Sequence, residues 1–217
     1  MAMDKTMSFK VDKDKSLRAK EILKEVYEKK EKKGYNPINQ IVGYIGEKYT
    51  AGNIKSISKG YVIRDIYVNG SYGVQQIDIV AITSKGILVI EKKTYIGLIV
   101  GSEYDKQWKI FVARGRRKYS MKNPHHQNFG HIQAILENFP TMKDLCISVV
   151  VFGNNAKLGD RIPANTIRDI DFKTFYNNLP NILTQQQMSE FAEQIQSFES
   201  KRVEYKKMHK EKIKAKR

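Results

Sequence analysis

The sequence predicts a mixed α/β fold, with a central mixed, largely antiparallel sheet flanked by helices. Three observations support this class. Stretches with the helical period lie before and after a series of stretches that alternate with the strand period of two. Two of the strand-like stretches are joined by a short hairpin signal, which makes them antiparallel neighbours. Hydrophobic residues make up 41% of the 217 residues, enough to build a buried core.

Helical patterns occupy the first part of the chain. Residues 14–33 carry one narrow apolar stripe, and Gly34 is a suitable end for that helix. A second helix is predicted to run to about Ser58, with Asn36 as its cap and Pro37 at its first position. The second predicted helix contains three glycines, Gly43, Gly46 and Gly52. Because glycine weakens a helix by about 1 kcal/mol relative to alanine, these residues indicate close packing or a nearby site.

The strand-like stretches lie in the middle of the chain. The glycine-rich residues 69–73 predict a turn, and residues 108–120 predict a second hairpin with a basic tip. The continuously apolar run 145–153 is typical of a buried strand. The other strand-like stretches are 61–68, 74–83, 86–95, 96–104 and 165–172.

Two further helices complete the pattern. One is predicted at 123–139, after Asn123-Pro124, and a long one from Leu183 onward, whose end is too basic and too polar to stay packed. We therefore expect three parts of the chain. They are a basic helical N-terminal extension at 1–35, the sheet-containing domain at 36–180, and a C-terminal helix with a basic tail at 181–217.

Composition excludes several classes of protein. The single cysteine, Cys146, excludes a disulfide framework and a cysteine-ligated zinc site. No apolar run approaches 18 residues, so we expect no membrane span. The N-terminal residues lack the apolar stretch of a signal peptide. We therefore expect a soluble, cytoplasmic protein without a membrane partner.

The net charge favours a polyanionic partner. The chain has 39 Lys and Arg against 23 Asp and Glu, a formal charge of +16, which attracts nucleic acid. Residues 201–217 hold nine basic and two acidic residues, and both this tail and the basic hairpin tip are candidate phosphate contacts. The alternative is that both are solvated, non-binding segments. The candidate contacts are Arg114, Arg116, Arg117 and Lys118 at the tip and Lys206, Lys207 and Lys210 in the tail.

The hairpin 74–95 brings acidic residues together. With Ser84 and Lys85 in the turn and Gly86 as a bulge, Asp78 lies opposite Glu91. Strand alternation places one set of side chains on a common face: Asp78, Val80, Ile82, Ile87, Val89, Glu91 and Lys93. It places a second set on the other face: Ile77, Ile79, Ala81, Leu88, Ile90 and Lys92.

Two carboxylates on neighbouring buried strands need a compensating cation. A divalent metal supplies it, and Mg²⁺ takes one or two carboxylates, several waters and a substrate phosphate. Lys93 is on the same side as Glu91 and could orient the attacking water or stabilise the phosphate. The alternative is a buried salt-bridge cluster of Asp78, Glu91 and Lys93 without catalysis.

Four separated pieces of the sequence then resemble a known family. These are GYIGEKYT from Gly43, QIDIVAITSKGILVIEKKTYIGLIVG from Gln76, the lone Trp108, and NPHHQN from Asn123. Together they are similar to the nuclease-related domain family, in the PD-(D/E)xK superfamily, over roughly residues 37–150. The resemblance implies a restriction-endonuclease-like fold, use of Mg²⁺ or Mn²⁺, and nuclease activity on nucleic acid, with DNA favoured.

The same resemblance implies a set of site residues. Asp78, Glu91 and Lys93 match the strand-borne catalytic set, with Glu47 as a further metal-side carboxylate and Gln127 in the Asn-Pro…Gln element. Lys92 stands where a smaller or more apolar residue is expected, and it faces away from the site.

Several roles stay open at this stage. Glu47 could be an exposed helix glutamate, and Gln127 could hold a water or phosphate or cap its helix. His125 and His126 are adjacent, which makes a zinc pair unfavourable, and His131 could lie at the surface. Trp108 fits core packing better than base stacking.

The reading with the most support is a metal-dependent nuclease. The alternative is a non-catalytic nucleic-acid-binding protein on the same fold. The sequence leaves open whether the chain also pairs with a separate protein or with a second copy of itself.

Overall fold

The computed structural model describes residues 37–215. The helix expected at 14–33, its end at Gly34 and the cap at Asn36 lie outside these residues. The chain divides into two units, Met1–Val42 and Gly43–Arg217. The second unit contains all strands of the described part, and the features that follow belong to it, apart from residues 37–42 at the start of the first described helix.

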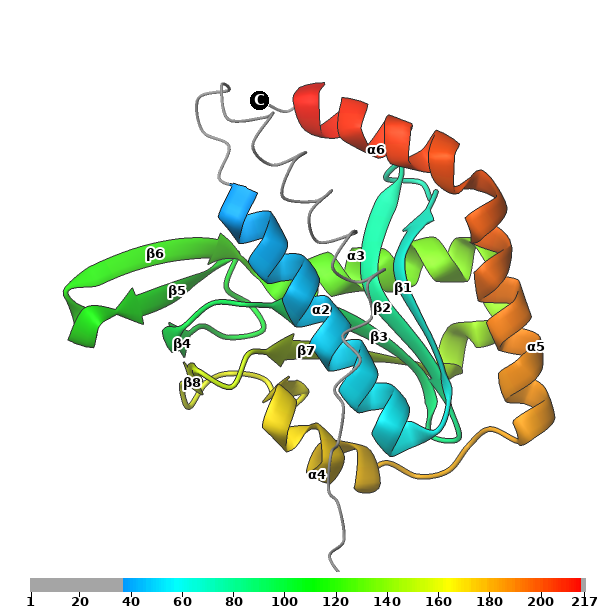
Figure 1. The fold of residues 1–217 in the computed structure, drawn as a ribbon, viewed down its shortest axis with the longest axis horizontal. Helices are drawn as coiled ribbons and strands as arrows, with labels where there is room; N and C mark the ends of the chain where they lie inside the picture. Colours follow the sequence, from blue (N-terminus) through cyan, green and yellow to red (C-terminus); the bar gives the residue numbers. More distant parts are fainter. Residues whose placement is uncertain (1–36, 216–217) are drawn as a thin grey trace, which may run out of the picture. The chain divides into compact units, whose positions relative to one another are not determined.

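A five-stranded mixed sheet forms the centre of this unit (Figure 1). Its strand order is β1-β2-β3-β7-β9, in which β1, β2 and β3 are antiparallel neighbours while β3, β7 and β9 run parallel. The bounds are Tyr61–Val68 for β1, Gln75–Thr83 for β2, Gly86–Lys93 for β3, Cys146–Phe152 for β7 and Thr166–Arg168 for β9. The mixed sheet with flanking helices that the sequence predicts is therefore confirmed.

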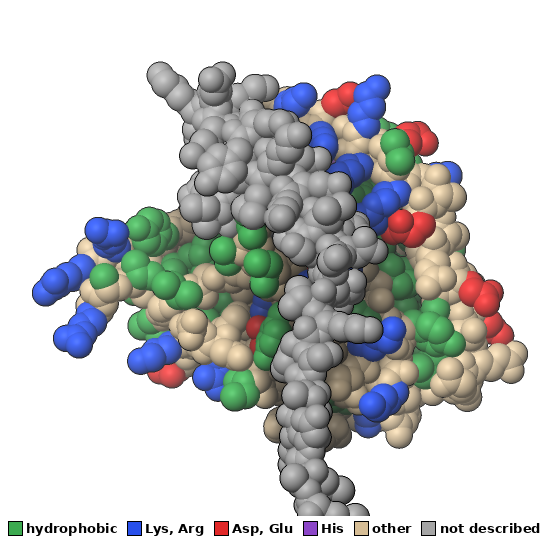
Figure 2. All heavy atoms as spheres, in the orientation of Figure 1, with side chains coloured by type: hydrophobic (Ala, Val, Ile, Leu, Met, Phe, Trp, Pro, Cys, Tyr) green, Lys and Arg blue, Asp and Glu red, His purple; other side chains and the backbone are tan. Residues whose placement is uncertain are grey.

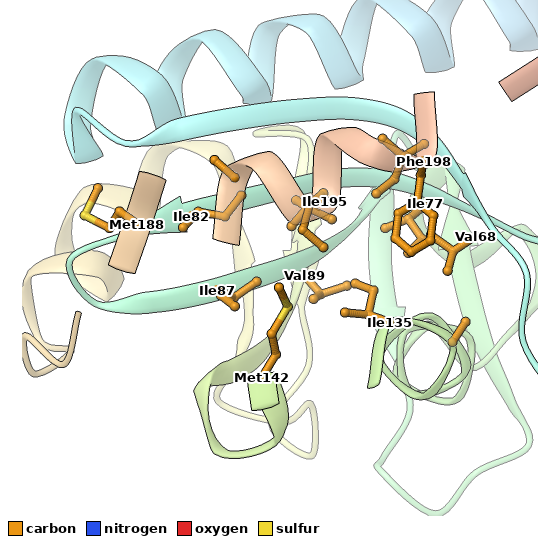
Figure 3. Packing of buried hydrophobic residues seen from close by; sticks show 14 of the residues in the cluster. Val68, Ile77, Ile82, Ile87, Val89, Ile135, Met142, Met188, Ile195 and Phe198 are labelled. Carbon is orange, nitrogen blue, oxygen red and sulfur yellow. The ribbon is translucent and has the colours of Figure 1, made fainter. Parts of the chain in front are cut away.

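Helices cover both faces of this sheet. The long helices are α2 (Pro37–Ser58), α3 (Pro124–Asn138), α5 (Gln185–Gln196) and α6 (Arg202–Ala215), and the short ones are α4 (Phe172–Asn177) and the 3-10 segment η2 (Pro140–Leu145). On one face, α3, η2 and α5 pack on Val80, Ile82, Ile87 and Val89 (Figure 3). On the other face, α2 and α4 pack on Ile79, Ala81, Leu88 and Ile90. The continuous apolar character of β2 and β3 follows from this double coverage.

A second, four-stranded sheet was not expected from the sequence. Its order is β6-β5-β4-β8, with bounds Gly97–Val100 for β4, Gln107–Val112 for β5, Arg117–Lys122 for β6 and Ala156–Leu158 for β8. The chain leaves the first sheet between β3 and β4 at Gly97, which has a φ of +95° and whose added Cβ would lie 2.3 Å from the carbonyl oxygen of Phe111. Only glycine tolerates both conditions.

The final helix is divided rather than continuous. A 3-10 turn at Ser197–Lys201 separates α5 from α6. The expectation that its end is too polar to pack is wrong as far as Lys212. His209 Nδ1 lies 3.1 Å from the carbonyl oxygen of Val74, and Lys212 Nζ donates to that of Tyr72. Long basic side chains thus hold α6 against the β1–β2 end through polar contacts instead of an apolar stripe. Within residues 37–215, no helix has the length and apolar composition of a bilayer span.

Candidate functional site

Two acidic residues meet where the β2–β3 ladder ends. The ladder starts at the turn with Thr83 paired to Gly86, and its register places Asp78 opposite Glu91. The predicted register is therefore correct, although Gly86 is paired and does not form a bulge. Beyond the last backbone pair, Asp78 Oδ2 accepts the backbone N–H of Lys92 at 2.8 Å. A side-chain carboxylate thus replaces a backbone carbonyl as the acceptor at this point.

The β1–β2 ladder is irregular at the same level. Residues on both sides of Asp65 and Asp78 are paired, but these two are not. Asp65 has a left-handed φ of 53°. The β2 strand also departs from alternation beside Asp78, because Ile77 joins the same hydrophobic cluster as Val80. The prediction that Ile77 shares the face of Ile79 and Ala81 is wrong, because it assumed an uninterrupted alternation along β2.

Asp65 is held in this conformation by side-chain contacts. Its carboxylate accepts hydrogen bonds from Gln76 Nε2 at 2.7 Å and from the guanidinium of Arg202 at 2.5 Å. Arg202 begins α6 and also lies over the ring of Tyr67. The C-terminal helix is therefore tied to the strand that borders Asp78, a connection without a local signal in the sequence.

Lys93 joins β3 to α3. Its Nζ lies 2.5 Å from Glu91 Oε1 and 3.0 Å from Gln127 Oε1. The cap of α3 is Asn123, whose side chain accepts the N–H of His125, so Gln127 is not needed for capping. Side chains of Glu91, Lys93 and Gln127 are thus brought together, as the sequence predicts.

His131 is an additional member of this group. It lies one helical turn after Gln127 on α3 and is only 6% exposed. Its Nδ1 is 3.4 Å from Glu91 Oε2, and within the described residues neither atom has a hydrogen-bond partner. Burial lowers the pKa of His131, and the charge of Glu91 opposes that shift. The four-residue spacing from Gln127 was the available signal for this placement.

The acidic groups of the site destabilise one another's charges. The pKa of Asp78 is raised well above its usual value, first by burial and then by the charges of Glu91 and Glu47. The pKa of Glu47 is raised to about 7, first by burial and then by Asp65, while Arg64 opposes the shift. Both groups therefore favour a compensating cation or a proton.

Glu47 reaches this region from α2. It is not the exposed helix glutamate of the alternative interpretation, because it is partly buried. An added Cβ on Gly46 would lie 2.6 Å from Thr94 Cγ2, whereas one on Gly43 or Gly52 would meet no atom of the described residues within 4 Å. Close packing is thus confirmed for Gly46 alone among the three glycines.

Lys92 belongs to a separate cluster on the opposite face. Its Nζ lies 2.6 Å from Asp169 Oδ2, and Thr50 donates its hydroxyl to the other carboxylate oxygen of Asp169. All three side chains are buried. The prediction that Lys92 faces away from Lys93 and Glu91 is confirmed. Lys92 and Asp169 form a separate, buried ion pair.

The start of α3 is held by a structural network. Asn123 Nδ2 donates to the backbone carbonyls of Ser102, Glu103 and Asp105. Trp108 is fully buried and donates its Nε1–H to the carbonyl of Ser102, so the core role expected for it is confirmed.

The two adjacent histidines have separate partners. His125 Nε2 lies 2.6 Å from Thr166 Oγ1, whereas His126 Nε2 lies 2.9 Å from the carbonyl oxygen of Glu103. The two rings are therefore held by different segments of the chain.

The basic candidates lie on two other segments. The tip residues Arg114, Arg116, Arg117 and Lys118 are all exposed at the end of the β5–β6 hairpin, and Figure 2 shows basic side chains gathered there. Lys207 and Lys210 are exposed on α6, while Lys206 is half-buried over the ring of Tyr67. Neither set belongs to the Glu91–Lys93 group.

The donor set of the site fits a hard divalent cation. Within residues 37–215, no three His, Cys, Asp or Glu side chains are close enough to form a ready-made metal cluster. Mg²⁺, however, is commonly bound through one or two carboxylates with waters completing its shell. Asp78 and Glu91 supply two carboxylates, Glu91 Oε2 has no hydrogen-bond partner among the described residues, and the pKa of Asp78 is raised in part by repulsion from Glu91.

Comparisons with known proteins give two matches along the chain. Residues 42–153 match the model of the nuclease-related domain family, and residues 4–50 match that of the IreB regulatory phosphoproteins. The second match was not foreseen from the sequence. No solved structure matches significantly.

The individual relatives also match either a long segment of about 127 residues or a short one of 45 residues. The chain is 35% identical over 127 residues to an uncharacterized protein of Bacillus anthracis, covering 54% of this chain and 58% of that protein. It is 58% identical over 45 residues to a "UPF0297 protein" of Ruminiclostridium cellulolyticum, covering 21% of this chain and 51% of that protein. A "UPF0297 protein" of Acetivibrio thermocellus is 56% identical over 45 residues, covering 21% of this chain and 50% of that protein. The chain thus spans about half the length of the curated relatives it matches.

The first match decides the family. It spans just over half of the 217 residues and includes the segments that carry Glu47, Asp78, Glu91 and Lys93. This chain belongs to the nuclease-related domain family.

Proposed function

We propose that this protein is a metal-dependent nuclease that hydrolyses phosphodiester bonds of nucleic acid, with DNA as the favoured substrate. The observation that carries the proposal is the group formed by Glu91, Lys93 and Gln127 beside Asp78, at the point where β2 and β3 separate. Family membership supports the same class of activity.

The chemistry assigns a role to each residue. In hydrolysis, the oxygen of a water forms a bond to phosphorus, the bond from phosphorus to one sugar oxygen breaks, and that oxygen gains a proton. Lys93 is positioned by Glu91 and Gln127 and its side chain is 17% exposed, so it can orient the water or stabilise the developing charge on the phosphate.

Asp78 and Glu91, with Glu47 as a further carboxylate, would hold Mg²⁺ or Mn²⁺. The metal would neutralise the negative charge that develops on the phosphate during the reaction. Since acidic groups alone repel a polyanion, the basic hairpin tip and α6 would provide the complementary contacts to the backbone: Arg114, Arg116, Arg117, Lys118, Lys206, Lys207 and Lys210.

A metal titration tests this proposal. Purified protein is incubated with supercoiled plasmid, single-stranded DNA and RNA, each with EDTA, Mg²⁺ or Mn²⁺. The proposal predicts cleavage of DNA that requires the metal and follows its concentration to saturation. Absence of cleavage from every substrate with both metals contradicts it.

The alternative is a nucleic-acid-binding protein without catalysis. It is favoured by one observation, that Lys93 Nζ already contacts both Glu91 and Gln127. Binding of labelled DNA in the same samples separates the two functions. Retained binding without any metal-dependent product supports this alternative.

A regulatory role is proposed for the N-terminal segment. Its support is the match of residues 4–50 to a family described as regulatory phosphoproteins. Deletion of residues 1–35 should change how cleavage is controlled, while the metal requirement and the products stay the same.

A cytoplasmic location stays a prediction from the sequence.

A further inference from the structure

Asp169 connects three segments of the described chain, on the face of the central sheet opposite to Glu91 and Lys93. It is the first residue of the 3-10 segment η3 (Asp169–Asp171). Its Oδ1 accepts the hydroxyl of Thr50 on α2, and its Oδ2 accepts Lys92 Nζ of β3 at 2.6 Å. A second residue of α2, Asn53, donates its Nδ2 to the backbone carbonyl of Asp169 at 3.0 Å. One residue therefore joins α2 to β3.

The side chains of Thr50, Lys92 and Asp169 form a junction that is closed to solvent. The three residues are 1%, 7% and 5% exposed. Where water is excluded, hydrogen bonds to a charged group are strengthened, and removal of one partner leaves a buried polar group without compensation. The Thr50–Lys92–Asp169 junction is thus a fixed connection, unlike a surface contact that exchanges with water.

Both sides of this junction lead to carboxylates of the candidate metal site. On α2, Glu47 precedes Thr50 by three residues, which is close to one helical turn. On β3, the backbone N–H of Lys92 donates to Asp78 Oδ2 at 2.8 Å. The lysine that pairs with Asp169 therefore also holds Asp78. The junction links the helix that carries Glu47 to the strand that contacts Asp78.

Glu47 needs an anchor of this kind because like charges lie close to it. Burial and then the charge of Asp65 raise the pKa of Glu47 to about 7. Repulsion between carboxylates favours a movement of the helix away from the site. The helix nevertheless lies close to the end of β3, because a Cβ added to Gly46 would lie 2.6 Å from Thr94 Cγ2.

Apolar packing alone does not fix the position of α2. Ala51 and Ile54 of this helix lie in one hydrophobic cluster with residues of β2 and β3, and Figure 1 shows α2 along the sheet. The hydrophobic effect is non-directional, so it resists separation of helix and sheet more than sliding of one along the other. A hydroxyl hydrogen bond keeps its two oxygens within about 2.5–3.0 Å of each other. The bond from Thr50 to Asp169 therefore opposes such sliding.

We infer that Thr50 and Asp169 are positioning residues, which fix α2 so that Glu47 stays at the candidate metal site. The inference rests on the proposed nuclease function, because it takes Glu47 as a metal-side carboxylate. It goes beyond that function by assigning a role in metal binding to residues on the opposite face of the sheet, outside the Glu91–Lys93 group.

Calorimetric titration of the metal-free, full-length protein with MnCl₂ in the absence of DNA tests the inference. Thr50→Val removes the hydroxyl but keeps a branched side chain and leaves the pair of Lys92 and Asp169 in place. Thr50→Ser is the conservative variant that keeps the hydroxyl. Thr174→Val, the same substitution at an exposed position of α4, is the matched control.

Thr50→Val should weaken Mn²⁺ binding by about 10-fold, the lower end of the loss found when a residue that orients a metal ligand is removed. Thr50→Ser and Thr174→Val should bind as the wild type does. In a Glu47→Gln background, Thr50→Val should have no further effect, because the carboxylate that it positions is already lost. Wild-type affinity of Thr50→Val, or an equal loss in both backgrounds, would overturn the inference.

Hydrogen exchange of the metal-free proteins, measured by mass spectrometry, provides a readout that does not depend on metal. In Thr50→Val, the α2 amides next to Glu47 should exchange about fivefold faster, while peptides of α3 and β7 are unchanged. Equal exchange of α2 in Thr50→Val and Thr174→Val would contradict the positioning role. A wild type that binds no Mn²⁺ contradicts the proposed nuclease function, and the exchange of α2 then decides the positioning role separately.

Discussion

Lys92 and Lys93 are neighbours in the chain, but their ammonium groups form ion pairs on opposite faces of the central sheet. Lys92 pairs with Asp169 on the face covered by α2 and α4, and Lys93 pairs with Glu91 on the face covered by α3. Strand alternation alone produces this separation. Lys92 therefore belongs to a structural ion pair, whereas Lys93 belongs to the candidate site.

The first prediction concerns the ion pair of Lys92. Lys92→Met removes the cation from a carboxylate that stays buried, so it should lower the free energy of unfolding by about 3–5 kcal/mol. Urea denaturation followed by circular dichroism measures the change. Lys55→Met, on an exposed part of α2, is the matched control and should change stability by less than about 0.5 kcal/mol.

A double variant separates the lost pair from lost packing. Lys92→Met combined with Asp169→Leu replaces both charges by apolar groups and should recover much of the stability, because a buried pair contributes little relative to a hydrophobic replacement. A Lys92→Met protein as stable as the Lys55→Met control would contradict the buried pair.

The second prediction concerns the left-handed backbone at Asp65. In an ordinary strand, alanine is more stable than glycine by about 0.5–1 kcal/mol. At Asp65, where φ is 53°, the order should be reversed, with Asp65→Gly more stable than Asp65→Ala by about 1 kcal/mol. Thermal unfolding of the two variants measures the difference, and both lose the Arg202 contact equally. The usual order would show that the residue is in a regular strand.

The third prediction concerns the pH dependence of stability. Burial, with a smaller effect of His126, lowers the pKa of His125 to about 4 from its usual 6.5. The unfolded chain therefore binds this proton more readily than the folded protein. The stabilising contribution is complete above pH 6.5 and is lost as the pH falls toward about 4. His125→Gln should flatten the stability curve across this window.

The lone tryptophan provides the readout for this prediction. The ring centroid of Trp108 lies 5.6 Å from that of His125, so its fluorescence reports unfolding at this position. Urea midpoints are measured at pH 7, 6, 5 and 4.5 for the wild type, His125→Gln and the exposed control His126→Gln. If the His125→Gln protein keeps the slope of the wild type, His125 is not the titrating group.

Local patterns were sufficient for much of the fold. The helix at 37–58, the strands of the first hairpin and the helix after Asn123-Pro124 are each determined by periodicity and terminal signals within the segment. The hairpin register follows from its two-residue turn and places Asp78 opposite Glu91. These predictions required no information from distant parts of the chain.

Long-range contacts account for what the sequence did not predict. The second sheet depends on pairing between β4 and the three-residue β8, which lie far apart in sequence. The conformation of Asp65 depends on Arg202, and the burial of His131 depends on how α3 lies over β3. Single-residue propensities contain no information about such contacts, so these features become visible only in the folded chain.

The rate of plasmid cleavage by Glu91→Gln, compared with the wild type in Mn²⁺ and in Mg²⁺, tests the central claim most directly. Glu91 is buried and contacts Lys93, so loss of its charge should lower the rate by about 1,000-fold, the upper end of the loss found when one preorganised hydrogen-bonding group is removed from an active site. Glu193→Gln, the same change at an exposed position of α5, should cleave at the wild-type rate. DNA binding in EDTA should be the same for all three proteins. A Glu91→Gln protein that cleaves as fast as the Glu193→Gln control would contradict the assignment of this site.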